Sequence, residues 1–270
     1  MHNIKLTLAY DGTDFSGWQM QPGKPTIQGT LSDVLEKLTQ HRLVIQAAGR
    51  TDAGVHATGQ VANFKTHSEL SAGEFQRAFN ALLPHSIRVV AAEEVGPDFH
   101  ARWDALAKTY RYRIFRGRVV PPFLWRYVQH DPYPLDYAAM AEAARRFEGE
   151  HDFASFAAST GSEEDDRKRT MTRLIYRSEV LLAAGEESAT SAEEWIYVVR
   201  GKSFLRYMVR KIMGTLVDVG RGKLSPEDIS KLFEMRDRSK SGPTMPPHGL
   251  CLAGVEYPDP ANSLPNKVLS

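Results

Sequence analysis

Residues 43–64 read LVIQAAGRTDAGVHATGQVANF, two apolar runs joined by a short loop of mostly small residues. The runs at 43–48 and 60–64 favour strands, and the loop contains glycine, which allows tight or unusual backbone. One carboxylate, Asp52, stands within this loop, two residues after Arg50. Reactive groups are often carried on short loops between rigid elements, although Thr, Asp and Gly also form ordinary turns. The stretch therefore predicts a tight connection with Asp52 as a candidate reactive group, and a plain turn is the alternative.

Strand and helix patterns continue on both sides of this loop and form a first half. Alternating residues predict a strand over 4–10, and 87–95 predicts another. Two helices between them carry start signals: Thr26 can cap the first, and Ser71 with Glu74 forms a capping box for the second. The first half is therefore expected to alternate strands with helices.

The second half repeats this rhythm. Alternation over 106–115 predicts a strand with Tyr110 and Tyr112 on one face, and Asp136 can cap a helix. The remaining expected elements are strands near 172–182 and 195–200, a long helix over 203–219, a helix opened by Ser225-Pro226 and a final strand over 249–257.

Strands and helices that alternate with short links favour an α/β or α+β fold with a mixed sheet. We expect a largely antiparallel sheet built from two similar halves flanked by helices. The first half, 1–103, carries the aspartate loop, and the second half, 104–270, carries the tyrosine strand and the arginine helix. A polar, charged segment at 159–169 predicts a mobile loop.

The composition is that of an ordinary globular protein: 42% of the 270 residues are hydrophobic and 25% are charged. The single cysteine, Cys251, excludes an internal disulfide framework. Because no signal-peptide pattern or long apolar run is present, we expect a cytoplasmic protein without membrane association. Net charge is only +1, but 105–120 and 200–211 each hold five basic side chains and no acidic one. Such segregated charge can form the basic face of a nucleic-acid-binding protein.

Missing motifs disfavour several chemistries. Nine histidines are present, but none belongs to an H-E-x-x-H pattern, so no metal is expected. The chain has neither a G-x-x-x-x-G-K-[ST] phosphate loop nor a G-x-G-x-x-G fingerprint, so no nucleotide cofactor is expected. There is no G-x-S-x-G elbow, and Cys251 falls in an expected strand, which disfavours serine and thiol hydrolases.

Asp52 remains the candidate reactive group, and arginines are its candidate partners. A carboxylate can act as a covalent nucleophile if it stays ionised in a partly dry cleft. Arg206 and Arg210 lie four residues apart on the expected helix, whose other positions are strongly apolar. An arginine on its buried side would need an anion, and pairing with Asp52 would lower the pKa of that carboxyl group. The alternative is that both arginines lie on a solvated face.

Aromatic residues supply a third element of the candidate site. Phe15, Trp18, Tyr110 and Tyr112 stand beside polar or basic residues. Proteins bind single-stranded RNA by stacking bases on aromatic rings while arginines hold phosphates. Tyr110 shares a basic strand with Lys108, so we hypothesise that it lies in a cleft. Core packing is the favoured interpretation of Trp18 and Tyr112.

Segments in matching order resemble the motifs of the TruA family of tRNA pseudouridine synthases over nearly the whole chain. They are 10–19 (YDGTDFSGWQ), 49–57 (GRTDAGVHA), 99–102 (FHAR) with 108–112 (KTYRY), 204–214 (FLRYMVRKIMG) and 249–252 (GLCL). One departure is Met245-Pro246, which stands where Ala-Pro is common in the family.

The resemblance implies a reaction and roles for three residues. A uridine of the tRNA anticodon stem-loop, at expected positions 38, 39 and 40, would be flipped into a cleft between the two halves and isomerised to pseudouridine without a cofactor or metal. Asp52 would be the nucleophile, attacking C1′ of the sugar or C6 of the base, or would assist a glycal route. Tyr110 would stack on the base and take part in proton transfer, and Arg210 would pair with Asp52.

The resemblance also implies a tRNA-binding surface and a homodimer. The residues expected to bind substrate are Arg50, Tyr110, Phe15, Trp18, Arg102, Lys108, Arg111, Lys202 and Arg206. Two other functions stay open at this point: a non-catalytic RNA-binding or RNA-chaperone protein, and a glycosidase. The glycosidase needs a second carboxylate roughly 5–10 Å from Asp52.

Overall fold

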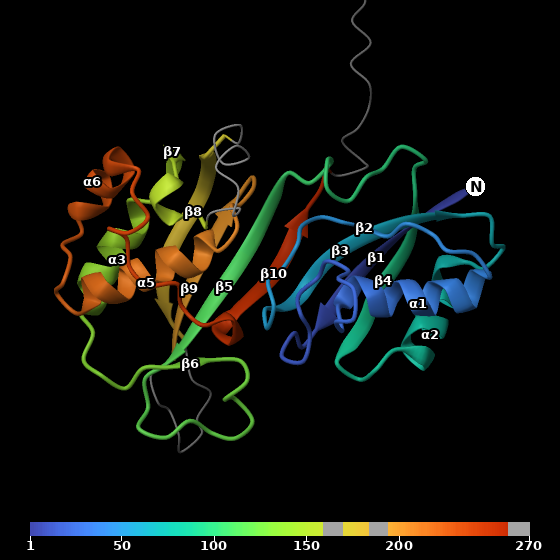
Figure 1. Ribbon diagram of the computed structural model, residues 1–270, viewed down its shortest axis with the longest axis horizontal. Helices are drawn as coiled ribbons and strands as arrows, with labels where there is room; N and C mark the ends of the chain where they lie inside the picture. Colours follow the sequence, from blue (N-terminus) through green and yellow to red (C-terminus); the bar gives the residue numbers. More distant parts are fainter. Residues whose placement is uncertain (159–169, 184–193, 259–270) are drawn as a thin grey trace, which may run out of the picture.

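A computed structural model describes residues 1–158, 170–183 and 194–258, so the loop predicted at 159–169 lies outside the described residues. The strands form one ten-stranded sheet in the order β4-β1-β3-β10-β5-β9-β8-β7, with β2 paired to β3 and β6 to β5 (Figure 1). The strands are β1 His2–Tyr10, β2 Gln46–Ala47, β3 His56–Thr66, β4 Ile87–Val95, β5 Ala107–Phe115, β6 Gln129–His130, β7 Gly149–Asp152, β8 Thr172–Leu182, β9 Glu194–Gly201 and β10 Leu250–Glu256. The helices are α1 Ile27–Thr39, α2 Ala72–Leu82, α3 Tyr137–Arg145, α5 Met208–Gly220 and α6 Asp228–Met235, with short 3-10 turns η1 Ala154–Phe156 and η2 Pro247–Gly249.

The two halves repeat one arrangement. In the first half β1 lies between β4 and β3, and in the second half β5 lies between β10 and β9. All four of these pairings are antiparallel. Helices α1 and α2 come after β1 and β3 in the chain, as α3 and α5 come after β5 and β9. The predicted mixed, largely antiparallel sheet of two similar halves is confirmed.

Strand β10 joins the two halves, although it comes from near the end of the chain. It pairs antiparallel with β5 and parallel with β3, and the parallel register consists of Cys251 opposite His56 and Leu252 opposite Ala57. This short pairing lies at the start of β3, directly after the Asp52 loop. The aspartate loop therefore stands at the seam between the halves.

Helices α1 and α2 cover the first half of the sheet and α3 and α5 cover the second, while α6 lies farther out and packs against η1 (Figure 1). Strand β1 alternates buried Ile4, Leu6 and Leu8 with partly exposed residues, as expected for a strand with one face in the core. Helix α5 is buried at most of its positions. One hydrophobic cluster contains buried residues from both halves, so α5 and the sheet share a single core.

The predicted helix starts agree with the structure in the first half. Thr26 caps α1 through its side chain, and Ser71 with Glu74 forms the capping box of α2. Asp136 likewise caps α3. These signals were reliable because each depends on side chains within one helical turn.

Three predicted boundaries are wrong. The helix predicted over 203–219 begins only at Met208, because Tyr207 has left-handed backbone with φ 62°. The strand predicted over 43–48 is reduced to β2, because only Gln46 and Ala47 pair with β3. The helix signalled by Ser225-Pro226 begins three residues later, at Asp228.

Candidate active site

The Asp52 loop is a tight turn held by backbone contacts. Within it, the amide of Val55 donates to the carbonyl of Asp52 at 3.1 Å. Gly54 has φ 75°, a conformation that side chains rarely allow, and its amide donates to the Phe15 carbonyl. The turn interpretation and the reactive-group interpretation therefore describe the same geometry, since the turn presents Asp52 beyond the end of the sheet.

The segment 10–19, the first family motif, supports this loop. The amide of Trp18 donates to the carbonyl of Thr51 at 3.0 Å, and the hydroxyl groups of Tyr10 and Thr51 lie 2.8 Å apart. Gly17 permits this approach, because a Cβ there would lie 2.7 Å from the Thr51 carbonyl oxygen. The glycine in the motif thus lets two loops pack backbone against backbone.

The Trp18 ring lies in the core and not in the pocket lining, in agreement with the favoured interpretation of this residue. Trp18 is only 2% exposed and lies in the hydrophobic core, with its ring centre 6.3 Å from that of Tyr10. An enclosed ring cannot stack on a base, so core packing describes Trp18. Phe15 is partly buried against the same core, and its contact with the Asp52 loop is made through its carbonyl.

A pocket opens at the seam and brings together several predicted site residues from both halves. Asp52 and Arg50 enter it from the first half, and Tyr110 and Arg206 enter it from the second. Its full lining is Arg50, Thr51, Asp52, Val55, Tyr110, Phe204, Leu205, Arg206, Tyr207, Met208, Val209 and Leu250. Asp52 is the one carboxylate among these lining residues, which leaves a two-carboxylate glycosidase without its second group.

Asp52 faces Arg210 across the seam. Nη1 of Arg210 lies 3.6 Å from Oδ2 of Asp52, and the two side chains are 13% and 24% exposed. Arg210 is itself held by the chain before η2, because its Nε donates to the carbonyl of Met245 at 2.6 Å. The predicted pairing is therefore present, with the arginine fixed at its other edge.

The predicted lowering of the Asp52 pKa by its arginine partner is present, but burial outweighs it. Burial raises the pKa of Asp52 above its usual value, while the charges of Arg210 and Arg206 and the hydrogen bond from Arg210 act in the opposite direction. Desolvation of the carboxylate outweighs the two cations. The arginines thus limit the rise, and removing either one would push the pKa of Asp52 higher.

Arg206 and Arg210 reach the pocket in different ways. Only Arg210 lies on α5, so the predicted spacing of four residues on one helix face is wrong. Arg206 precedes the helix and is exposed. The alternative that both arginines lie on a solvated face does not describe them, because the charges of both act on Asp52.

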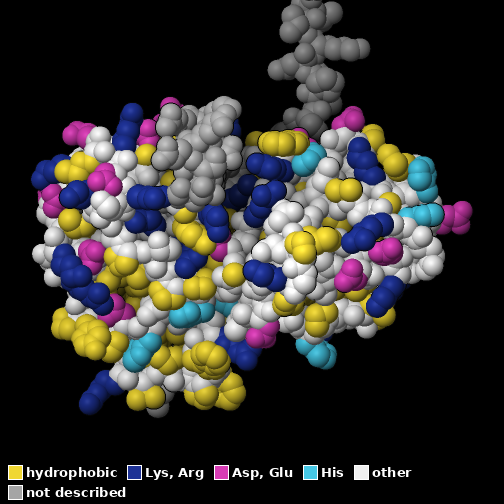
Figure 2. All heavy atoms as spheres, viewed as in Figure 1, with side chains coloured by type: hydrophobic (Ala, Val, Ile, Leu, Met, Phe, Trp, Pro, Cys, Tyr) yellow, Lys and Arg dark blue, Asp and Glu magenta, His cyan; other side chains and the backbone are white. Residues whose placement is uncertain are grey.

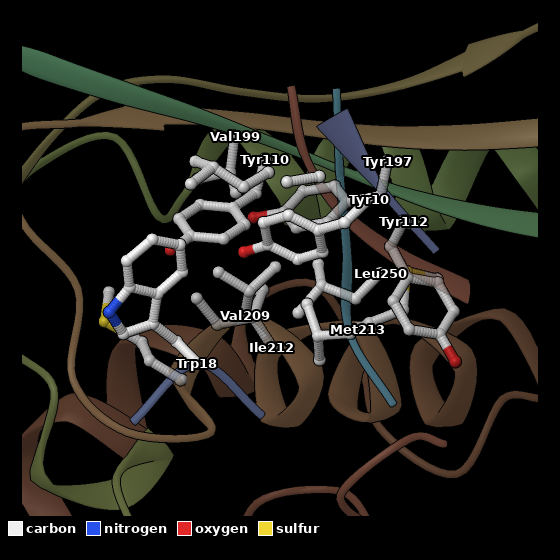
Figure 3. Packing of buried hydrophobic residues seen from close by; sticks show 14 of the residues in the cluster. Tyr10, Trp18, Tyr110, Tyr112, Tyr197, Val199, Val209, Ile212, Met213 and Leu250 are labelled. Carbon is white, nitrogen blue, oxygen red and sulfur yellow. The ribbon is translucent and has the colours of Figure 1, made fainter. Parts of the chain in front are cut away.

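Tyr110 supplies a buried ring at the pocket wall. It lies on β5, is 8% exposed, and meets the ring of Phe204 edge-on at 5.0 Å. Figure 3 shows the rings of Tyr110 and Tyr10 over Val209 and Ile212 of α5. Burial raises the pKa of Tyr110, and the nearby Tyr10 and Asp52 raise it further, so its hydroxyl stays protonated. Among the described residues this hydroxyl has no hydrogen-bond partner, which leaves it available to a substrate.

Lys108 lies beside the base of the aspartate loop. Its Nζ would be 3.4 Å from a Cβ on Gly49, next to Arg50. Burial, with a smaller contribution from Arg102, lowers the pKa of Lys108 to about 8. No acidic side chain pairs with Lys108 in the part of the chain that the structure describes. Lys108, Arg50 and Arg102 are thus cations near one edge of the pocket, and Figure 2 shows Lys and Arg side chains gathered where the halves meet.

Six of the predicted substrate residues are not among those that line the pocket: Phe15, Trp18, Arg102, Lys108, Arg111 and Lys202. Arg111 is exposed and, by the alternation of β5, faces away from Tyr110. Lys202 lines a separate surface hollow with Trp103, Tyr176 and Arg200. Both positions could reach other parts of a large substrate, but neither contacts the Asp52 pocket.

Sequence reasoning missed a group of residues that anchors the aspartate loop. His56 accepts a hydrogen bond from the Gly12 amide at Nδ1, and its Nε2 lies 2.9 Å from the Arg126 carbonyl. The Tyr127 hydroxyl donates to Asp11, which lies 3.2 Å from His56. His56 and Asp11 stand inside the quoted motifs and could have been singled out. No local pattern marked Tyr127.

Within residues 1–158, 170–183 and 194–258, no three His, Cys, Asp or Glu side chains are grouped so as to hold a metal ion. No helix in these ranges has the length and apolar character needed to cross a membrane.

Comparisons with known proteins agree with this site. A family model described as tRNA pseudouridine synthase matches residues 7–104 and 143–258. The chain is 45% identical to tRNA pseudouridine synthase A of Solibacter usitatus over 257 residues, covering 95% of this chain and 100% of that protein. It is 44% identical to tRNA pseudouridine synthase A 1 of Desulfotalea psychrophila, with the same coverage, and 45% identical to the Geobacillus sp. enzyme over 94% of this chain and 98% of that one. The chain therefore belongs to the tRNA pseudouridine synthase family, whose members are isomerases.

Proposed function

We propose that this protein isomerises uridines in the anticodon stem-loop of tRNA, at the expected positions 38, 39 and 40. The observation that carries the catalytic assignment is the pocket in which Asp52 from one half meets Tyr110 and Arg206 from the other, with Arg210 on Asp52. A pocket at the seam can accept a base only if that base leaves its stack, as in other enzymes that act on bases in duplexes.

Each residue then has a role set by its surroundings. Asp52 is the nucleophile that enables the N1–C1′ bond to break, and Arg210 and Arg206 favour its ionised form. Tyr110 stacks on the detached uracil, and its protonated hydroxyl takes part in proton transfer. C5 then bonds to C1′, the C5 proton is lost and N1 is protonated, so the product contains the same atoms as the substrate.

Basic residues beside the pocket would hold the tRNA backbone. We assign phosphate contacts to Arg50, Lys108 and Arg102 at one edge and to Arg206 at the other. Arg111 and Lys202 are proposed to contact more distant parts of the tRNA, because they lie outside the pocket. Phosphate contacts of this kind make binding weaken as salt rises, because bound counterions are released.

The test is incubation of the protein with an unmodified tRNA transcript, followed by mapping of pseudouridine at each position. Pseudouridine in the anticodon stem-loop is expected with the wild type. Asp52→Asn is expected to bind the transcript and form none. Modification only outside the stem-loop would contradict the substrate assignment, and full activity of Asp52→Asn would contradict the nucleophile.

We also propose that the enzyme works as a homodimer in the cytoplasm, each subunit forming its cleft between 1–103 and 104–270. Large apolar side chains are exposed on the segment between β5 and β6: Val119, Phe123 and Trp125 are 81%, 88% and 56% exposed. A contiguous apolar patch usually marks an interface. Light scattering should give a dimer mass for the wild type and a monomer mass for Phe123→Ser with Trp125→Ser. A monomeric wild type would contradict the dimer.

A further inference from the structure

Tyr207 lies between the two arginines that act on Asp52. The guanidinium groups of Arg206 and Arg210 lie 4.7 Å and 4.9 Å from the centre of its ring. Arg206 also donates a hydrogen bond from Nη2 to the Tyr207 hydroxyl at 3.0 Å. Because cations are attracted to the face of an aromatic ring, one side chain contacts both guanidinium groups.

The two arginines depend on this ring to different degrees. Arg210 has a second anchor in the Met245 carbonyl. For the exposed Arg206, Tyr207 is the one residue within the described ranges that contacts the guanidinium through a hydrogen bond or a ring. Without Tyr207, Arg206 would be free to move into solvent, and Arg210 would lose one of its supports.

The backbone of Tyr207 adds an independent observation. With φ 62° and ψ 0°, it has the left-handed conformation directly before the first turn of α5. A Cβ crowds this conformation, so residues other than Gly, Asn and Asp seldom adopt it. Uncommon backbone of this kind is concentrated at functional sites, where the surrounding structure holds it. Asn or Gly would suit this backbone better, but neither has a ring. The tyrosine therefore suggests that the contact of its ring with the two guanidinium groups is needed here.

We propose that Tyr207 is a positioning residue that holds Arg206 and Arg210 against Asp52. This inference rests on the proposed catalytic role of Asp52. Three charged or titratable groups face that carboxylate: Arg206 before α5, Arg210 on α5 and Tyr110 on β5. Of these, the two arginines favour the ionised carboxylate, and Tyr207 contacts both of them.

The test compares Tyr207→Asn and Tyr207→Phe in the tRNA assay between pH 5 and 9. Asn suits the left-handed backbone but has no ring, so its melting temperature should equal or exceed that of the wild type. Its kcat should fall at acid pH, and the acid limb of kcat against pH should move up by about one pH unit, which corresponds to a loss of up to about tenfold below the pKa of Asp52. Phe keeps the ring, so its kcat should stay within about threefold of wild type, with little change in the acid limb.

Tyr133→Asn is the matched control, because Tyr133 is 68% exposed and lies away from the pocket. It should leave the pH profile unchanged. An Asn variant with a wild-type acid limb, or a Phe variant as impaired as Asn, would overturn the inference. So would an Asn variant that melts well below the wild type, since the ring would then be needed for folding. If wild-type protein forms no pseudouridine in this assay, the proposed function fails instead.

Discussion

The titration of Lys108 leads to a prediction about tRNA affinity. With a pKa of about 8, this amine is protonated in about nine-tenths of molecules at pH 7 and in about one-tenth at pH 9. A phosphate at the pocket edge would need the charged form. Affinity that depends on this one proton should therefore fall about tenfold between pH 7 and pH 9, equivalent to about 1.4 kcal/mol.

The assay is equilibrium binding of unmodified tRNA by the Asp52→Asn variant at fixed salt, so that no turnover occurs. Lys108→Met should bind at pH 7 about as weakly as the parent at pH 9, with little change across this range. Lys108→Arg should bind well and be equally insensitive to pH, because arginine stays charged. If Lys108→Met keeps the full tenfold fall, another group carries the pH dependence and the reasoning is refuted.

The same pKa has a consequence for stability with a defined sign. The unfolded chain keeps a proton on Lys108 up to about pH 10.5, whereas the folded protein releases it near pH 8. The unfolded state therefore binds more protons in that window, and the contribution of Lys108 to stability rises with pH from about 8 to 10.5. Lys108→Met should raise the melting temperature at pH 7, and this gain should disappear at high pH.

Three further outcomes are expected from the geometry of the site. Arg210→Met should raise the pKa of Asp52 further and lower kcat at pH 6 by at least about tenfold, while changing the affinity for tRNA less; equal losses in both would contradict this. Gly17→Ala should lower the free energy of unfolding by about 1–3 kcal/mol in urea, because φ is 91° and the Thr51 carbonyl blocks a Cβ; unchanged stability would contradict the loop packing. Trp18→Phe should cost about 1–3 kcal/mol of stability and leave the tRNA affinity of the folded protein unchanged, whereas a specific loss of affinity would restore the ring as a substrate contact.

Local signals in the sequence were sufficient for much of the fold. Caps such as Thr26 and Ser71 act within one helical turn, and alternation over 4–10 follows from the two faces of a strand. The start of α5 was missed because nothing local announces left-handed backbone at a tyrosine. The extent of the strand at 43–48 was overestimated because Leu43, Val44 and Ile45 have no register partner on β3, and a local apolar run does not show where pairing begins.

Some features of the candidate site could likewise be predicted from the sequence, and others could not. The motif around Asp52 and its resemblance to a family identified the carboxylate, the arginine and the tyrosine from residue types and order alone. The enclosure of Trp18 and the contact of Tyr207 with two arginines could not be read from the chain, because they depend on residues brought together from separate elements.

Residue types and their periodicity were enough to establish the alternation of strands and helices, the two similar halves and the candidate carboxylate, since those depend on neighbours a few positions apart. The pairing of β10 with β3, which places Asp52 opposite Arg210, arises only when segments about two hundred residues apart come together. The pKa of Asp52 is also a tertiary property. The packed halves exclude water from the carboxylate, which raises its pKa, and the two arginines lower it. The exclusion of water has the larger effect in this structure.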